Sequence, residues 1–131
     1  MREIKFRAWD NSDKIMYNDI QLGIRFDDGS VYHFEDFFMP PQGDYHDWVL
    51  MQFTGLQDKN GVDIYEGDII SIQYIMKEYT NLVVCWSNDS ALFYTSKEVG
   101  GEGCAISRSH MEEFEVIGNL YENHELLTDN N

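Results

Sequence analysis

The sequence predicts a mainly β fold. Short runs with alternating apolar side chains recur along its 131 residues, Gly, Asn and Asp turn signals separate them, and helical periodicity is almost absent. We expect a β-rich N-terminal segment over residues 1–52, packed on a small β-barrel over residues 53–131. Packing is favoured because about fifty residues bury little surface on their own.

The first predicted strand covers residues 2–9. Ile4, Phe6 and Ala8 point to one side of it, which is the period-2 pattern of a strand with one buried face. The polar run over residues 10–14 predicts a turn directly after this strand.

Two apolar-patterned runs, 20–26 and 31–38, flank Asp28 and Gly29. They predict a β-hairpin, since glycine can take the positive φ that a tight turn requires. Two adjacent prolines follow. Because proline lacks a backbone donor, we expect residues 39–47 to form an exposed loop.

The centre of the chain predicts two strands joined by a corner. The strands cover residues 48–55 and 69–75, and Asn60-Gly61 and Gly67 between them signal tight turns.

The acidic residues of this corner have a structural interpretation. Asp58 and Asp68 can accept hydrogen bonds from nearby backbone amides, as aspartate does in Asx-turns. Glu66, Gly67 and Asp68 then form the tight turn into the first barrel strand, and no chemistry is needed to explain these residue types.

The C-terminal part continues with short strands. In chain order it predicts a strand, a turn, a strand, a glycine-rich loop and a last strand, over residues 82–86, 87–90, 91–95, 97–103 and 114–120. Ser109 and Glu112 have the spacing of a capping box, which predicts a short helical turn before the last strand. A second helical turn is expected within 121–127. This order is typical of an SH3-like roll.

The charge of the chain limits its partners. Nine Lys and Arg residues face 24 Asp and Glu residues, giving a net charge of −15 at pH 7. Direct binding to nucleic acid or to an anionic membrane requires the opposite sign. An acidic surface instead favours a basic partner protein or cations, although many soluble proteins are acidic without a specific purpose.

Cysteine usage and the N-terminus predict a cytoplasmic protein. The chain begins without the apolar run of a signal peptide, and no stretch approaches about 20 apolar residues. Cys85 and Cys104 are the only cysteines and form no CxxC motif. We expect free thiols, with Cys85 buried and inert in its strand.

The sequence offers residues for three kinds of catalytic or metal site. The acidic and histidine-containing loop offers possible ligands for zinc or manganese at His33, Glu35, Asp36, Asp44, His46 and Asp47. Asp58, Asn60, Asp63, Glu66 and Asp68 offer oxygens for calcium. Cys104 and His110 offer a nucleophile and a base. None has the spacing of a known motif, so no catalytic residue, metal or other cofactor is predicted.

Aromatic side chains offer an interaction surface. Trp86, Phe93 and Tyr94 flank the tight turn of the predicted barrel, and small barrels often bind peptides through exposed rings. Tyr65, Tyr74 and Tyr79 could join them. The alternative is that about half of these rings belong to the core.

Three motifs resemble the YopX family of phage and prophage proteins: "REIKFRAWD", "MQFTGLQDKNGVDIYEGDII" and "VIGNLYENHELL". His124 departs from the family pattern, which has proline after Tyr-Glu-Asn. The resemblance implies a phage or prophage origin and an SH3-like C-terminal domain, but no activity and no catalytic residues. The central motif residues that we assign to the structural turn are Phe53, Thr54, Gly55, Asp58, Asn60, Gly61, Tyr65, Glu66, Gly67 and Asp68.

The function expected from these observations is a non-enzymatic protein-interaction module with an acidic surface, binding a host or phage protein. An alternative is an acidic DNA mimic that inhibits a host nucleic-acid-binding protein. A second alternative is a small metal-dependent enzyme. Exposed strand edges also make a homo-oligomer possible.

Overall fold

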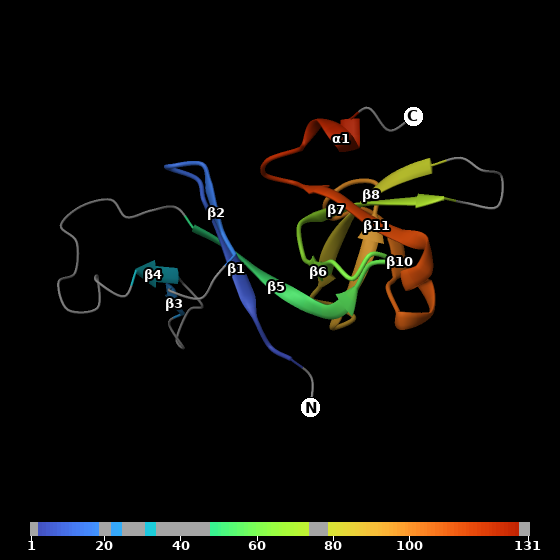
Figure 1. Cartoon of the computed structure of the whole chain (residues 1–131), viewed down its shortest axis with the longest axis horizontal. Helices are drawn as coiled ribbons and strands as arrows, with labels where there is room; N and C mark the ends of the chain where they lie inside the picture. The colour runs from blue at the N-terminus through green and yellow to red at the C-terminus, as the bar shows by residue number, and fades with distance from the viewer. Residues whose placement is uncertain (1–2, 19–21, 25–30, 34–47, 74–78, 129–131) are drawn as a thin grey trace. The chain divides into compact units, whose positions relative to one another are not determined.

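The computed structural model describes residues 3–18, 22–24, 31–33, 48–73 and 79–128 (Figure 1). These residues form the mainly β fold that the sequence predicts, with antiparallel sheets and only short helical turns. The chain divides into two compact units, residues 4–52 and residues 53–131 together with 1–3. The packing of the first segment onto the second stays a prediction.

The unit of residues 4–52 is built around a three-stranded antiparallel arrangement. Its central strand β1 (Phe6–Asp10) pairs with β2 (Ile15–Tyr17) and with the first half of β5 (Trp48–Gln57). In this register Trp9 lies opposite both Met16 and Val49. The expected turn over residues 10–14 connects β1 and β2.

The prediction that β1 buries one face is wrong. Arg7, Ala8, Trp9 and Asp10 are all buried, although neighbouring side chains of a strand point to opposite faces. Hydropathy alone places Asp10 outside. Its carboxylate is instead held inside, because Oδ1 accepts hydrogen bonds from the backbone N–H groups two and three residues later, at 2.8 and 3.1 Å.

The predicted hairpin is present as a paired set of short strands. β3 (Leu22–Ile24) and β4 (Val31–His33) are antiparallel, with Ile24 opposite Val31. The turn at Asp28-Gly29 and the expected loop over residues 39–47 lie outside the described residues.

The second unit holds a five-stranded antiparallel sheet with the order β10-β9-β8-β7-β11, curved into a half-barrel (Figure 1). The strands are β7 (Asp68–Gln73), β8 (Tyr79–Ser87), β9 (Leu92–Ser96), β10 (Gly103–Ala105) and β11 (Phe114–Asn119). The first strand of this sheet pairs with the last, since β11 returns to the free side of β7. Closure into an SH3-like roll stays a prediction.

Two helical turns are present where the sequence predicts them. The 3-10 helix η2 (Arg108–Glu113) precedes β11, and α1 (Glu125–Thr128) follows it. Helix α1 is fastened to β8 because the Asn81 side-chain amide donates to the Leu126 carbonyl at 2.9 Å. The strand β10 is a difference: the sequence predicts only a glycine-rich loop over residues 97–103.

The core of the second unit lies on one face of its sheet. Alternate residues of β7 and β8 point to this face, where they meet the start of β11 and a residue of the short strand β6 (Asp63–Tyr65). The buried members of the cluster are Ile64, Ile70, Ile72, Leu82, Val84 and Phe114. Burying a side chain of this size stabilises the fold by about 1.5–3 kcal/mol. The cluster therefore holds the five-stranded sheet in its curved shape, on which any site in this unit depends.

Candidate functional site

The corner between β5 and β7 is organised by the buried carboxylate of Asp58. Oδ1 accepts hydrogen bonds from the backbone N–H groups of Asn60 and Val62 at 2.8 and 2.9 Å, and Oδ2 accepts one from Val116 at 2.8 Å. Val116 belongs to β11, and Asp58 is only 4% exposed. One side chain therefore closes its own turn and ties that turn to the last strand.

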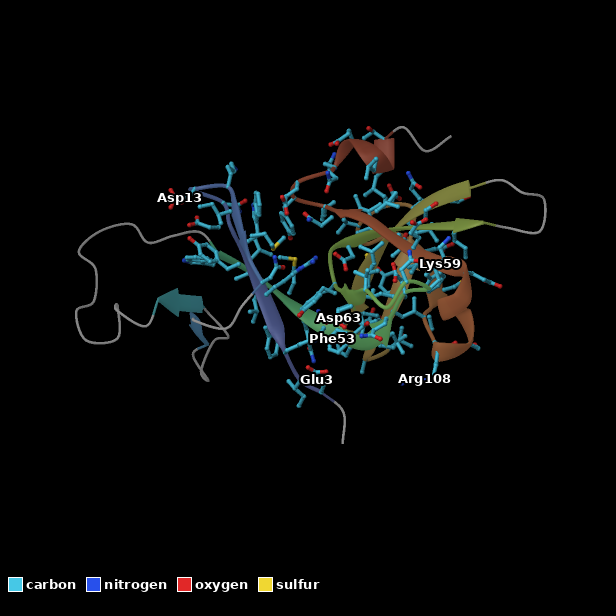
Figure 2. The ribbon with its side chains drawn as sticks, viewed as in Figure 1. Glu3, Asp13, Phe53, Lys59, Asp63 and Arg108 are labelled. Atoms are coloured by element: carbon cyan, nitrogen blue, oxygen red, sulfur yellow. The ribbon has the colours of Figure 1, made fainter. Side chains whose placement is uncertain are left out.

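A second link joins the same turn to β11. The backbone N–H of Lys59 donates to the Phe114 carbonyl at 3.0 Å. Lys59 is labelled in Figure 2. Its ammonium nitrogen lies 3.6 Å from Oε2 of Glu115, and both side chains are 44% exposed. An exposed pair of this kind adds little stability, so the backbone links carry the attachment.

The turn at Glu66 and Gly67 is a junction of three strands. Gly67 has a φ of 86°, a conformation that costs an L side chain about 1–2 kcal/mol. Its N–H donates to the Val84 carbonyl at 2.8 Å, and its carbonyl accepts from Leu120 N–H at 2.7 Å. Asp68, 2% exposed, accepts from the Tyr65 N–H at 2.8 Å.

The remaining residues of the central motif also support the corner. Thr54 Oγ1 donates to the Ile64 carbonyl at 2.7 Å, and Gly55 and Gly61 have positive φ values of 89° and 81°. The rings of Phe53 and Tyr65 contact each other with centroids 5.6 Å apart, where β5 and β6 run together (Figure 2). The motif is thus placed as a connected structural element.

Metal ligands do not gather at this corner. The carboxylate of Asp58 already accepts hydrogen bonds from three backbone amides. Asp63 accepts a hydrogen bond from the Gln57 side chain at 3.0 Å. In the part of the chain that the structure describes, no group of three or more His, Cys, Asp or Glu side chains lies close enough to hold a metal ion. The other predicted ligands, in residues 33–47, fall outside the described side chains, as do Tyr74, Tyr79 and His110.

The three aromatic interaction candidates separate onto two faces. Trp86 is 42% exposed and packs edge-on against Phe93, with ring centroids 4.9 Å apart. The indole N–H donates to the side chain of Asn88 at 3.0 Å. Tyr94 follows Phe93 directly and so points to the opposite face, where it pairs across the ladder with Cys85.

A hollow of about 530 Å³ lies on the core side of the five-stranded sheet. Its floor consists of Ile72, Leu82 and Phe114, the outer members of the core cluster. Thr95 of β9 and Cys104 of β10 line its wall as a cross-strand pair. The hollow was not predicted, because its lining comes from five strands and one of them, β10, carries no strand pattern in the sequence.

Charged residues also line the hollow. Glu98, Glu102 and Glu113 are acidic residues of the lining, and Lys97 is a basic one. All four side chains are exposed. We call these four residues and the floor residues together the acidic hollow. Three acidic residues and one basic residue give these four residues a net formal charge of −2.

The two thiols differ in environment. Cys85 is buried and Cys104 is exposed, and neither forms a disulfide. Burial raises the pKa of the Cys85 thiol above its ordinary value, against a smaller lowering by hydrogen bonds from the Gly100 backbone and Tyr94. The folded protein therefore holds this proton at alkaline pH values where an unfolded chain releases it, and folding stability falls as the pH rises through that range.

Selective alkylation follows from this difference. We expect N-ethylmaleimide at neutral pH to modify Cys104 in the folded protein and Cys85 only after unfolding, because the thiolate is the reactive form and access is required. Intact mass spectrometry counts the adducts. The control variant Cys104→Ser is expected to stay unmodified until urea is added; rapid modification of this folded variant would contradict the burial of Cys85.

Comparisons with known proteins are consistent with this architecture. The fold places this chain among the mainly β proteins. Its central motif forms the corner between β5 and β7 and has a structural role. The family model described as YopX protein matches residues 5–128. The chain belongs to the YopX family, as its three motifs predict.

A solved structure extends the likeness over the whole fold. The crystal structure of protein EF1440 from Enterococcus faecalis is similar, with a TM-score of 0.69 and 27% sequence identity over 97% of this chain and 99% of that chain. No match is found among curated proteins. Within the described residues, no helix has the length and apolar character needed to cross a membrane. These comparisons define the family and the fold and assign no activity.

Proposed function

We propose that this chain is a phage or prophage accessory protein that acts in the cytoplasm by binding another protein, without catalysing a reaction. The observation that carries the proposal is the acidic hollow, an apolar floor rimmed by carboxylates on a sheet fixed by the core. Protein-binding surfaces commonly combine an apolar centre with a polar rim.

The net charge of −15 supports a basic partner. Charge complementarity accelerates encounter and disfavours acidic competitors. The corner residues support a binding role rather than catalysis, because Asp58 and Asp68 hold backbone amides instead of projecting free carboxylates into a cleft.

The test is an affinity capture from nuclease-treated lysate of a bacterial host, at low and at high salt, followed by reconstitution with the purified partner. We expect a basic protein that binds at low salt, is lost at high salt and re-forms a complex of defined stoichiometry. A partner that itself binds DNA, and whose DNA binding is blocked, would replace the proposal with the DNA-mimic alternative. Absence of any reconstituted complex at either salt would overturn the binding function.

A further inference from the structure

We propose that the acidic hollow is the docking site for an extended basic segment of a partner protein, with an apolar side chain on the floor and a Lys or Arg at the rim. This inference rests on the proposed binding function and adds the place and the chemistry of recognition.

The size of the hollow selects a short segment. Its volume of about 530 Å³ falls within the range of about 300–1,000 Å³ that is typical of ligand pockets. The floor side chains Ile72, Leu82 and Phe114 are 8%, 7% and 3% exposed, so they offer a shallow apolar contact above a packed core. A short extended segment fits a space of this volume, whereas a folded domain does not enter it.

The charge around the floor selects a cation. Glu102 precedes β10 and Glu113 ends η2, so acidic residues line the hollow from two separate segments. Together with Glu98 they outnumber the single ammonium group of Lys97. A phosphate or an acidic peptide is repelled here, whereas a basic side chain gains from each carboxylate.

The sheet edge beside the hollow favours an extended backbone. Strand β10 ends the sheet, and among the described residues it pairs only with β9. All three of its residues are exposed, and Cys104 and Ala105 line the hollow. An incoming strand can hydrogen-bond to such an edge while its alternate side chains point to the floor.

The first experiment uses two fluorescent peptides on the full chain. One peptide alternates lysine and valine, and the other alternates glutamate and valine. Each is about six residues long and spans about 20 Å when extended, at about 3.3 Å per residue. We expect saturable binding of the lysine peptide in fluorescence anisotropy and none of the glutamate peptide. Absence of saturable lysine-peptide binding overturns the docking site, and a partner complex that still forms would show that the binding function survives it.

Matched charge variants locate the bound peptide. Glu102→Gln combined with Glu113→Gln removes two rim charges, and Asp89→Asn combined with Glu125→Gln removes two exposed charges outside the hollow. We expect the rim pair to weaken binding about fivefold, as for partly exposed ion pairs, and the control pair less than about twofold. Equal losses in both pairs would indicate diffuse attraction to an acidic surface and overturn the docking site.

Covalent blocking of the hollow tests the docking site independently of charge. Alkylation of Cys104 with N-phenylmaleimide places a bulky ring on the wall of the hollow. We expect lysine-peptide binding to fall at least about tenfold, the loss of an apolar contact of this size, while treated Cys104→Ser protein binds as before treatment. Unchanged binding after complete alkylation would overturn the site, and circular dichroism verifies that the alkylated protein stays folded.

Discussion

Replacing Asp58 by alanine is expected to lower the free energy of unfolding by about 3 kcal/mol. Three backbone N–H groups lose an ionised acceptor, and each such bond contributes about 1.5–3 kcal/mol. Asn60 and Val62 are exposed, so water replaces part of that loss. The Val116 N–H is partly buried on β11 and is harder to satisfy. Urea unfolding followed by tryptophan fluorescence measures the shift in midpoint.

Two variants give this prediction its controls. Asp58→Asn keeps one carbonyl oxygen, which can still serve the Asn60 and Val62 amides, and is expected to lose about half as much stability. Lys59→Met removes only the exposed contact with Glu115, which is worth less than about 1 kcal/mol. If Asp58→Ala were no more destabilising than Lys59→Met, the corner would not depend on this carboxylate.

The corner also illustrates what could be predicted from the sequence. Asn60-Gly61 and Gly67 are residue types that favour tight turns. The positions of these turns can therefore be predicted from the sequence alone. The bond from Val116 to Asp58 joins residues 58 positions apart. No local pattern indicates such a contact, because turn propensity describes only neighbours along the chain.

The short strands β6 and β10 are not predicted from the sequence for a related reason, because neither has an alternating apolar pattern. Residues 103–105 of β10 are all exposed, so hydropathy does not alternate and the three-residue segment resembles a loop. β6 is equally short and lies inside the turn-rich corner. Asp10 shows the opposite case: it is polar but buried, because the following turn supplies its hydrogen bonds. Tertiary pairing determines the two strands, whereas the hydrogen bonds of Asp10 come from its own local turn.

The acidic hollow could not be derived from the sequence even in outline. Its floor side chains belong to separate strands, and its acidic residues cannot be distinguished by sequence from the other Asp and Glu residues of an acidic chain. Only the return of β11 to β7 and the pairing of β10 with β9 bring Phe114, Leu82 and Cys104 around one space. The hollow exists because of the order in which the strands pair in the sheet. It therefore depends on β10, which is the strand that is hardest to predict from the sequence.

Replacing Gly103 by alanine is expected to detach β10 from the sheet. A Cβ at this position would overlap the Thr95 carbonyl oxygen, which is backbone and cannot rotate away. Overpacking of this kind costs about 1–3 kcal/mol. Because β10 is an edge strand, the rest of the sheet survives. We expect faster hydrogen exchange of the β10 amides and of those β9 amides that face β10, with unchanged protection in β7 and β8, together with loss of lysine-peptide binding.

The matched control is Val99→Ala, an exposed substitution in the loop before β10 at a residue that does not line the hollow. It is expected to leave amide exchange and peptide binding at their original values. Retained protection of β9 in Gly103→Ala would mean that the two strands can separate slightly and keep their ladder. Loss of protection in β10 with full peptide binding would instead show that the wall of the hollow does not contribute to recognition, which would confine the docking site to the floor and the rim carboxylates.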